Sequence, residues 1–375
     1  MKSVNPNRGN SRLVFLVPLL ACLSFRAQAH PEDLVDRIIN ESNYQKAAQA
    51  ESSKYGKPLW EIDAGVPFIG SPVHEEMTKA SFNISNIENR PFDYTRDESF
   101  IHGVFWNDDP EDLLCPQCSI LNLRKLDNRW GITYANRFLA AKKKVQAERN
   151  GDSLPIFKIG DGLLERSHFG DLQFLHGMAS KDGETAGETQ DKILAWAEFT
   201  YKVAIGEIPQ KTKLNQIPIE RVRKLFVGAP KLENLTIEQI FRRNVFAKRA
   251  AIGSLLHMIQ DSYASGHADR VVLDYTTTNG NRVFKRSIIR EFHCYTNQDE
   301  NLHKQDDRWP DGLDKLHPID ELNPITTGAR ILQFMYANDR SGAPWADVEK
   351  YLREVVFSIS DRNTPAGPGE KYRKK

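Results

Sequence analysis

The stretch that decides the fold and the chemistry of this chain is His257-Met-Ile-Gln-Asp261-Ser-Tyr-Ala-Ser-Gly266-His267. His257 and Asp261 are four residues apart, so on a helix they share one face and can bind one ion. Gly266 favours a helix end, which would direct His267 toward a second ion. Imidazole and carboxylate are the ligands of hydrolytic zinc sites. A random chain of this composition would contain this H-x3-D-x5-H spacing about 0.02 times, so we interpret it as a metal-binding motif.

Other candidate ligands occur along the chain in patterns that are weak when taken singly. His303 and Asp307 form another i, i+4 pair, which is more commonly a surface pair. The remaining candidates are imidazoles and carboxylates beside expected helix starts, turns or apolar residues: His74, Asp108, Asp109, His168 and His176. Each has an ordinary structural explanation, such as a turn for residues 107–110. Taken together they support a metal-binding role, because they occur along the chain in the order His, Asp, His, H-x3-D-x5-H and H-x3-D.

This order resembles the zinc-dependent phospholipase C family and its relatives, the single-strand-specific zinc nucleases of fungi and plants. The similarity runs from about Trp60 to Asp307, and its specific parts are H-x3-D-x5-H and the Asn-Leu-His-x3-Asp element. It implies a mainly α-helical fold with three zinc ions in a cleft. We therefore expect a multi-helix, zinc phospholipase C-like domain with a trinuclear metal cleft.

The resemblance also assigns the candidate ligands to three Zn²⁺ ions. The assignments are Asp108, His176, His257 and Asp261 for the first ion, His74 and a shared Asp261 for the second, and His267, His303 and Asp307 for the third. Asp109 is the alternative to Asp108, and His168 is the alternative to His176. An N-terminal Trp ligates the second ion in the family, and Trp60, 14 residues before His74, has nearly that spacing. The interval between Asp108 and His176 is several times longer than in the family.

The function that the resemblance implies is a zinc-dependent phosphodiesterase of the phospholipase C type. It would cleave glycerophospholipids such as phosphatidylcholine, at a membrane surface, to diacylglycerol and a phosphorylated head group. Asp108 would orient or deprotonate the attacking water as well as bind zinc. Aromatic residues near the motifs could hold choline or stack nucleobases, namely Phe105, Trp106, Phe174, Tyr263 and Trp309. The alternatives are a single-strand-specific zinc nuclease or other phosphodiesterase, and a non-catalytic metal-binding envelope protein.

Residues 1–29 have the form of a secretory signal peptide. A basic start precedes an apolar run too short to span a membrane, and Ala27-Gln28-Ala29 has the form of a cleavage site. We therefore expect an exported protein, periplasmic or secreted, with a lipid anchor at Cys22 as the alternative. No other apolar run reaches spanning length. Without the four basic residues of this segment, the formal net charge of +1 becomes −3, which gives no argument for nucleic-acid binding.

The rest of the chain divides into a polar N-terminal segment (30–59), a helical domain (60–362) and a Pro/Gly/Lys-rich tail (363–375) expected to be disordered. Apolar spacing predicts helices near 72–82, 131–148, 190–206, 236–264, 287–306, 324–338 and 344–359. Asn279-Gly280 predicts a β-hairpin over 271–285. Cys115 and Cys118 favour a local disulfide. The expected fold class is mainly α with this one small inserted hairpin, and with long loops near 107–130 and 207–235.

Overall fold

A computed structural model describes residues 73–85, 98–111, 113, 128–147, 157–241, 246–278, 281–299, 301–303 and 322–374. Some predicted features lie outside these residues: the signal peptide (1–29), Cys22, the polar segment (30–59), Trp60, Cys115, Cys118, Asp307 and Trp309. Within the described residues the fold is mainly α-helical with one two-stranded sheet, in agreement with the expected fold class. None of the described helices is long and apolar enough to cross a membrane.

The helices and strands follow one another in this order: α3 (Val73–Ile84), α4 (Glu98–Trp106), α5 (Asn128–Ala147), α6 (Leu163–Phe169), η2 (Gln173–His176), α7 (Ala186–Ile205), η3 (Leu214–Gln216), α8 (Glu220–Arg223), α9 (Ile237–Ile240), α10 (Ala247–Asp261), β1 (Ala268–Thr278), β2 (Asn281–Phe292), α12 (Pro324–Arg340), α13 (Trp345–Tyr351) and η5 (Leu352–Val356). The predicted helices at 72–82, 131–148, 190–206 and 324–338 correspond to α3, α5, α7 and α12. The one at 344–359 is α13 continued by η5, a stretch of π-helix.

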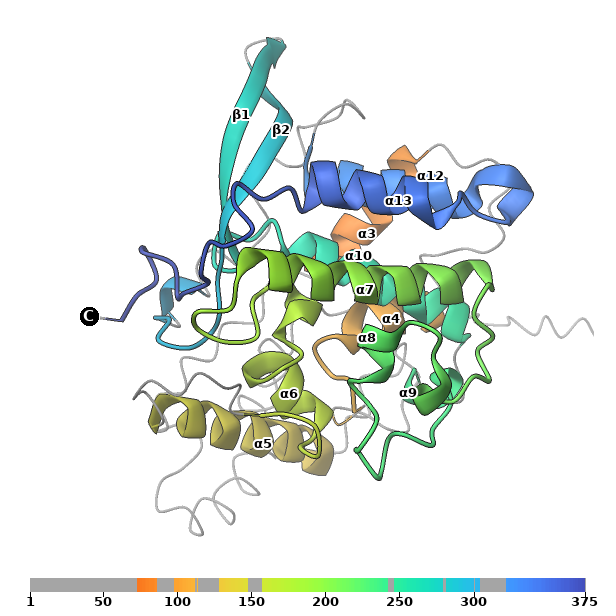
Figure 1. The fold of residues 1–375 in the computed structure, drawn as a ribbon, viewed down its shortest axis with the longest axis vertical. Coiled ribbons are helices and arrows are strands. Elements are labelled where there is room, and N and C mark those ends of the chain that lie inside the picture. Colours follow the sequence, from red (N-terminus) through yellow and green to blue (C-terminus); the bar gives the residue numbers. More distant parts are fainter. Residues whose placement is uncertain are drawn as a thin grey trace, which may run out of the picture.

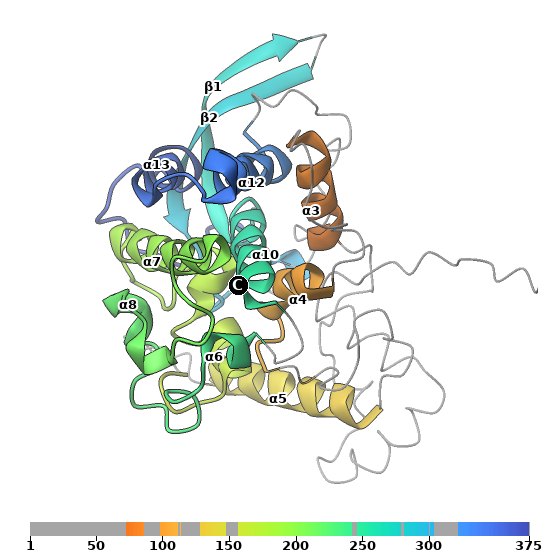
Figure 2. The ribbon, with the colours of Figure 1, turned by 90° about the vertical axis from the view of Figure 1, so that its right-hand side faces the viewer.

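The central helix of the fold is α10, in which every residue from Ala250 to Asp261 is buried. α4 and α7 pack against it, and the ribbon shows it enclosed by neighbouring helices (Figures 1 and 2). Glycines make the contact with α4 close. A Cβ at Gly103 would lie 2.1 Å from Ala250 O, and a Cβ at Gly253 would lie 2.5 Å from Val104 N. The two backbones can approach this closely because neither glycine has a side chain.

Large aromatic side chains fill the core beside α10. Trp106 and Trp196 stack with their ring centroids 5.7 Å apart, and Phe241 lies 4.9 Å from the Trp106 ring. The indole N–H of Trp106 donates to Ile240 O at 2.8 Å, so its polar atom is satisfied in the interior. This packing fixes the end of α4 against α7 and against the end of α9.

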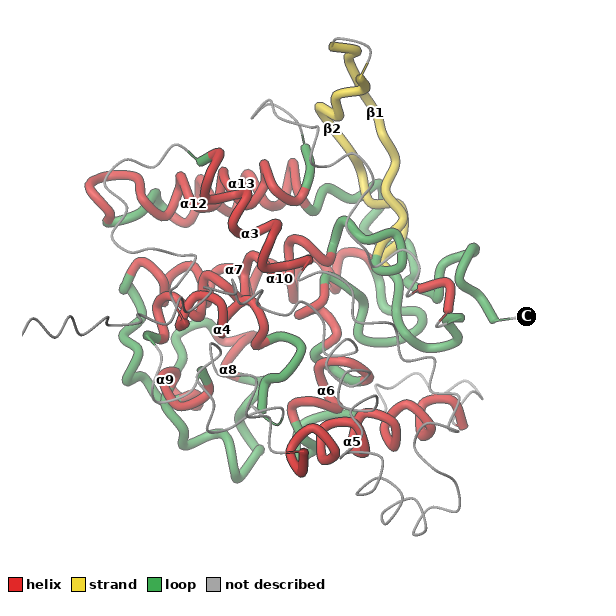
Figure 3. The backbone as a smooth tube through the Cα atoms, turned by 180° about the vertical axis from the view of Figure 1, so that it is seen from behind, coloured by secondary structure: helices red, strands yellow, loops and turns green. Residues whose placement is uncertain are grey.

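The β-hairpin and α5 lie at opposite ends of the molecule (Figures 1 and 2). The two strands form a ribbon that projects beyond α12 and α13, and Figure 3 shows it in yellow from behind. They pair antiparallel from Ala268 opposite Phe292 to Thr278 opposite Asn281. The predicted hairpin is therefore present, and it is longer at both ends than the expected 271–285.

The predicted helix at 287–306 is wrong at its start, because residues 287–292 belong to β2. Ser287 and Ile289 are buried, whereas Arg290 is exposed. The pairing with β1 skips Arg290, and this irregularity explains why Phe292 is also buried although it lies three residues after Ile289. Apolar residues on one face and polar residues on the other give a strand its period of two. In the described part of this segment, helix occurs at residues 301–303.

The segment predicted as one helix over 236–264 contains two helices, α9 and α10. Thr236 does precede a helix, and its N–H donates to Gln239 Oε1 at 2.8 Å, as in half of a capping box. Phe246, the residue immediately before α10, has a conformation and a hydrogen bond that separate α10 from α9. This residue has extended dihedrals and donates its N–H to Ser99 Oγ of α4 at 2.9 Å. A side chain from another helix thus replaces the helical hydrogen bond.

The expected disorder of the tail is wrong for residues 363–374, which pack against the body of the protein. Backbone bonds run from Cys294 N to Gly367 O at 2.9 Å and from Ala366 N to Glu184 O at 2.7 Å. Tyr372 is only 2% exposed. Composition misled the prediction, because it does not record the backbone hydrogen bonds that hold this segment.

Candidate metal centre

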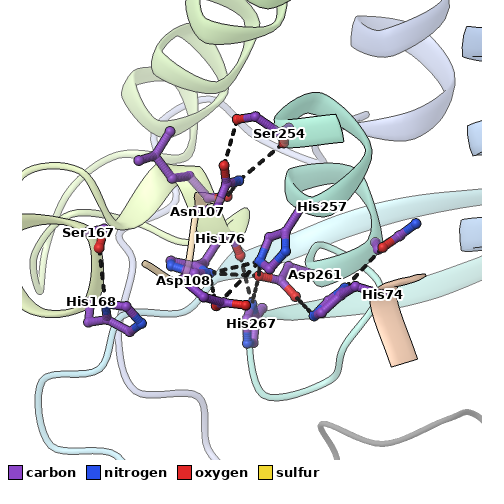
Figure 4. A network of polar contacts seen from close by, with 12 residues as sticks. His74, Asn107, Asp108, Ser167, His168, His176, Ser254, His257, Asp261 and His267 are labelled. Carbon is purple, nitrogen blue, oxygen red and sulfur yellow. Dashed lines mark hydrogen bonds and ion pairs between the residues drawn. The ribbon is translucent and has the colours of Figure 1, made fainter. Parts of the chain in front are cut away.

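Six of the predicted ligands converge on one buried position, from elements far apart in the sequence (Figure 4). His74 lies near the start of α3, Asp108 follows α4, His176 ends η2, His257 and Asp261 lie on the last turns of α10, and His267 follows α10. Each of these side chains is at most 4% exposed. The structure therefore brings together residues that the sequence separates by nearly 200 positions.

Asp261 lies at the centre of this group. Its Oδ1 is 3.2 Å from His74 Nε2. Its Oδ2 is 2.8 Å from His176 Nδ1 and 3.0 Å from His257 Nε2, and it is 3.9 Å from His267 Nδ1. The two carboxylate oxygens thus face different histidines, as a carboxylate shared by two ions would. This arrangement follows from the i, i+4 spacing of His257 and Asp261 on α10.

Four donor atoms of the group lie close together. We call the residues that carry them, Asp108, His176, His257 and Asp261, the four-ligand cluster. His257 Nε2 is 3.3 Å from His176 Nδ1 and 3.6 Å from Asp108 Oδ1. His176 Nδ1 and Asp108 Oδ1 are 3.8 Å apart. Asp261 Oδ2 is 2.8 Å from His176 Nδ1 and 3.0 Å from His257 Nε2, so five of the six distances among the four atoms lie between 2.8 and 3.8 Å. Zinc bonds of about 2.0–2.1 Å in a tetrahedron imply edges of about 3.3 Å.

Backbone carbonyls orient two of the histidine rings. His257 Nδ1 donates to Val104 O at 2.7 Å, and His267 Nδ1 donates to His176 O at 2.6 Å. A carbonyl can only accept, so the proton is on Nδ1 and the Nε2 lone pair is available. His267 Nε2 is buried and makes no hydrogen bond within the described residues. Both rings are therefore in the tautomer that binds a metal through Nε2.

Gln260 orients a third ring and is a residue that the sequence reasoning missed. Its Oε1 accepts from His74 Nδ1 at 3.0 Å, and its Nε2 donates to Thr78 Oγ1 at 2.8 Å. His74 Nε2 is thereby directed to Asp261. The available signal was its place in the sequence, immediately before Asp261 on the same helix. Together, His74, His257 and Asp261 form a second group with metal-ligand spacing, beside the group of Asp108, His176 and His257.

The structure separates the two pairs of alternatives. Asp108 belongs to the four-ligand cluster, whereas Asp109 Oδ1 accepts from Leu113 N at 2.8 Å and so closes a turn. His176 also belongs to the cluster. His168 lies apart in Figure 4, with its Nδ1 3.0 Å from Ser167 Oγ, and its ring is 5.0 Å from that of His176. Neither Asp109 nor His168 is in a group with metal-ligand spacing among the described residues.

The pair assigned to the third ion is also brought together, in part. His267 and His303 stack with ring centroids 4.9 Å apart, and His303 is 5% exposed. We call these two residues the His267–His303 pair. Their expected partner, Asp307, lies outside the described residues. The structure thus supplies two of the three ligands proposed for this ion.

Three of the five candidate choline-binding aromatics, Trp106, Phe174 and Tyr263, contact other parts of the protein. Trp106 and Phe174 are 2% and 1% exposed and belong to the core. The Tyr263 ring faces the guanidinium of Arg270, whose Cζ is 4.2 Å from the ring centroid. These aromatic faces are occupied by the protein itself, so they give no argument for a choline substrate.

The electrostatics of the group fit a divalent cation. Burial lowers the pKa of His176 to about 4, although the Asp261 carboxylate acts in the opposite direction. Burial alone would raise the pKa of Asp261, but His257, His74 and His267 hold it well below its usual value. Neutral imidazole and ionised carboxylate are the forms that bind metals. Two buried carboxylates, those of Asp108 and Asp261, would be costly to pack without a positive charge nearby, supplied either by protonated histidines or by a metal ion.

The comparisons with known proteins identify no relative of this chain. No protein-family model, no curated protein and no solved structure matches it. The site therefore has to be interpreted from its own geometry.

Proposed function

We propose that this protein is an exported zinc-dependent phosphodiesterase of the phospholipase C type. The observation that carries the proposal is the four-ligand cluster, in which five of the six distances between donor atoms lie between 2.8 and 3.8 Å, near the edge length expected around a zinc ion. The proposed export rests on the predicted signal peptide at 1–29. Zinc suits an exported hydrolase because it is redox-inert and binds both imidazole and carboxylate.

The residues around the cluster support more than one ion. Asp261 presents one oxygen to His74 and the other to the four-ligand cluster, so we propose it as the bridge between two zinc positions. His267 and His303, with Asp307, would hold a third. Three ions in one buried group would also contribute to folding, because each compensates carboxylates and imidazoles that the fold has removed from water.

When bound, zinc would activate water at neutral pH and polarise a phosphate oxygen. The protein's own contribution is to hold the ligands and to handle a proton. Asp108 is fully buried and lies at the edge of the cluster next to His257, where it can orient the attacking water or accept its proton. Val104 O keeps His257 in the tautomer that leaves Nε2 available. In-line attack on a phosphodiester then yields an alcohol and a phosphomonoester.

A phospholipid is our first choice of substrate, and a single-stranded nucleic acid is the second. The whole chain has a formal net charge of only +1, whereas nucleic-acid enzymes commonly carry a basic surface that neutralises phosphates. The reaction chemistry at the metal is the same for both substrates. The choice therefore has to be made by experiment.

The test is metal analysis of the purified protein together with three hydrolysis assays. We expect two or three zinc ions per chain, hydrolysis of bis-p-nitrophenyl phosphate that chelator abolishes and zinc restores, and faster cleavage of phosphatidylcholine vesicles than of single-stranded DNA. Preference for DNA would indicate the nuclease alternative. Bound zinc without hydrolysis of any of the three substrates would indicate the non-catalytic metal-binding protein. Fewer than two zinc ions would contradict the multinuclear site.

A further inference from the structure

Asn107 is a fully buried amide at the point where three ligand-bearing elements meet (Figure 4). Its Nδ2 donates to Leu175 O at 2.7 Å and to Ser254 O at 3.1 Å. Its Oδ1 accepts from Ser254 Oγ at 2.5 Å. Both amide protons and the carbonyl are therefore used, as a fully buried amide requires.

Each partner of Asn107 is next to a member of the four-ligand cluster. Asn107 itself precedes Asp108, and Leu175 precedes His176 in η2. Ser254 lies on α10, three residues before His257 and hence about one turn away. One amide thus connects the end of α4, the 3-10 helix η2 and α10, the three elements that carry Asp108, His176 and His257.

The surroundings of this amide are rigid. Trp196 of α7 donates its indole N–H to Ser254 Oγ at 3.1 Å, so the hydroxyl that Asn107 accepts from is itself fixed. Trp196 stacks on Trp106, the residue before Asn107. Polar groups this deeply buried are held by the cost of leaving them unbonded, about 1–3 kcal/mol for each. The network therefore opposes sliding of any of the three elements past the others.

We infer that Asn107 is a positioning residue for the metal centre: it sets the separations between Asp108, His176 and His257. Those separations, 3.3 to 3.8 Å, are three of the donor-atom distances given above for the four-ligand cluster. The side chain lies behind the ligands and touches them only through its own peptide and those of its partners. The role rests on the proposed metal centre, but the geometry that it fixes belongs to the protein alone.

The decisive variants remove the network in two steps, with a matched control elsewhere. Asn107→Leu removes all three hydrogen bonds of the amide. Ser254→Ala removes the one to Asn107 Oδ1, together with the bond from Trp196 to Ser254 Oγ, and keeps both bonds donated by Asn107 Nδ2. Gln190→Leu is the control, because Gln190 is also a buried amide, donating to Phe357 O at 2.7 Å, but it joins α7 to the segment after η5, away from the ligands. Ser254→Ala keeps the inference testable if Asn107→Leu does not fold.

Zinc affinity is measured on the folded protein by competition with a chelator, and cobalt substitution reports the ligand geometry through its visible spectrum. We expect Asn107→Leu to bind zinc about 10- to 100-fold more weakly than wild type and Ser254→Ala to fall between them. Both should alter the cobalt spectrum, whereas Gln190→Leu should lose stability and keep both properties. A purely structural amide would lower stability in all three variants and leave affinity and spectrum unchanged, which would overturn the inference.

A measurement without metal separates this inference from the proposed function. In chelator, the ring ¹⁵N signals of His176 and His257 should shift in Asn107→Leu, while those of His293, which bonds to Gly266 O outside the network, should not. Absence of zinc from the wild type would defeat the proposed function, and the ring signals would still decide the positioning role. Unchanged signals at His176 and His257 would overturn it.

Discussion

The four-ligand cluster and the His267–His303 pair are built differently. The residues of the cluster come from α10, from η2 and from the end of α4, where the helices are buried and close together. The pair stands on the loop after α10 and on residues 301–303, which are connected to the body by individual hydrogen bonds. Gln298 Nε2 and His293 Nδ1, for example, both bond to Gly266 O, at 2.7 and 3.1 Å.

This difference predicts two grades of metal site in one protein. A ligand in a close-packed helix moves only if the core moves, and that costs several kcal/mol. A ligand on a loop moves when one or two hydrogen bonds open, each with a net contribution of about 1 kcal/mol. We therefore expect the cluster to be fixed and the pair to be adjustable, and the following predictions test that contrast.

The largest effect is expected from Asp261→Asn, which removes the carboxylate that the four-ligand cluster shares with His74. The amide loses the negative charge that faces His74, His176 and His257. We expect loss of at least two zinc ions per chain and a fall in hydrolysis of bis-p-nitrophenyl phosphate of about 10³-fold or more, equivalent to about 4 kcal/mol of barrier. Metal analysis and kcat measure the two quantities.

The matched control for this change is Asp191→Asn. Asp191 lies on α7 and pairs at the surface with Arg362 at 3.0 Å, so its loss should cost at most about 1 kcal/mol of stability. It should leave the zinc content unchanged. Retention of the full zinc content by Asp261→Asn would show that Asp261 is not the bridge.

The next effect is a pH dependence of the metal-free protein. Burial lowers the pKa of His176 to about 4 from its usual value near 6.5, so the folded protein binds fewer protons than the unfolded chain between these values. Stability should therefore fall as the pH is lowered from 6.5 toward 4, by up to about 3 kcal/mol. Denaturant titrations in chelator measure this change.

His176→Asn supplies the control, because it keeps a polar group at this position and cannot titrate. Its stability should depend less on pH across the same window. An equal slope in wild type and variant would show that His176 is not the group responsible. Since Asp261 titrates below its usual range, its own contribution should be lost only at more acid pH.

A smaller effect, confined to the cluster, is expected from Gly103→Ala. The new Cβ would lie 2.1 Å from Ala250 O, so α4 must move away from α10. We expect a loss of about 2 kcal/mol in the free energy of unfolding and weaker zinc binding, because Val104 O would withdraw from His257. Ala140→Ser, at an exposed position of α5, should change stability by less than about 0.5 kcal/mol. Wild-type stability for Gly103→Ala would show that the close contact between α4 and α10 is not essential.

The parts that the sequence predicted well are those with a local cause. The H-x3-D spacing placed His257 and Asp261 on one helix face, because the helical repeat alone determines that geometry. Periodic apolar residues likewise located α3, α5, α7 and α12. Long-range contacts decided the rest. The strand at 287–292 and the break before α10 depend on where β1 and Ser99 lie in space, which no local pattern records.

The same distinction applies to the site. The sequence offered His168 as the alternative to His176, and the contacts with Asp261 and Asp108 distinguish the two. The sequence indicated only a turn at Asn107. Its hydrogen-bond partners are 68 and 147 positions away, so no local pattern could reveal them. Ligand types are thus predictable from the sequence, whereas the residues that hold the ligands are visible only in three dimensions.

The smallest effect, and the most selective, is expected from Tyr372→Phe. The Tyr372 hydroxyl donates to Ser265 Oγ at 2.9 Å and so ties the C-terminal segment to the loop that carries His267. Removing it should cost about 1 kcal/mol of stability and weaken zinc binding at the His267–His303 pair by up to about tenfold. The four-ligand cluster should keep its zinc, because its elements do not depend on this bond.

Tyr201→Phe makes the same chemical change far from the loop. Its hydroxyl donates to Ala343 O at 2.9 Å, between α7 and the turn before α13. A similar loss of stability with all zinc retained is expected. If both tyrosine variants release the same zinc, the effect is one of global stability. If Tyr372→Phe releases zinc from the four-ligand cluster first, the cluster holds its zinc less firmly than the His267–His303 pair does. The proposed contrast between a cluster fixed by the core and a pair held by a loop would then be wrong.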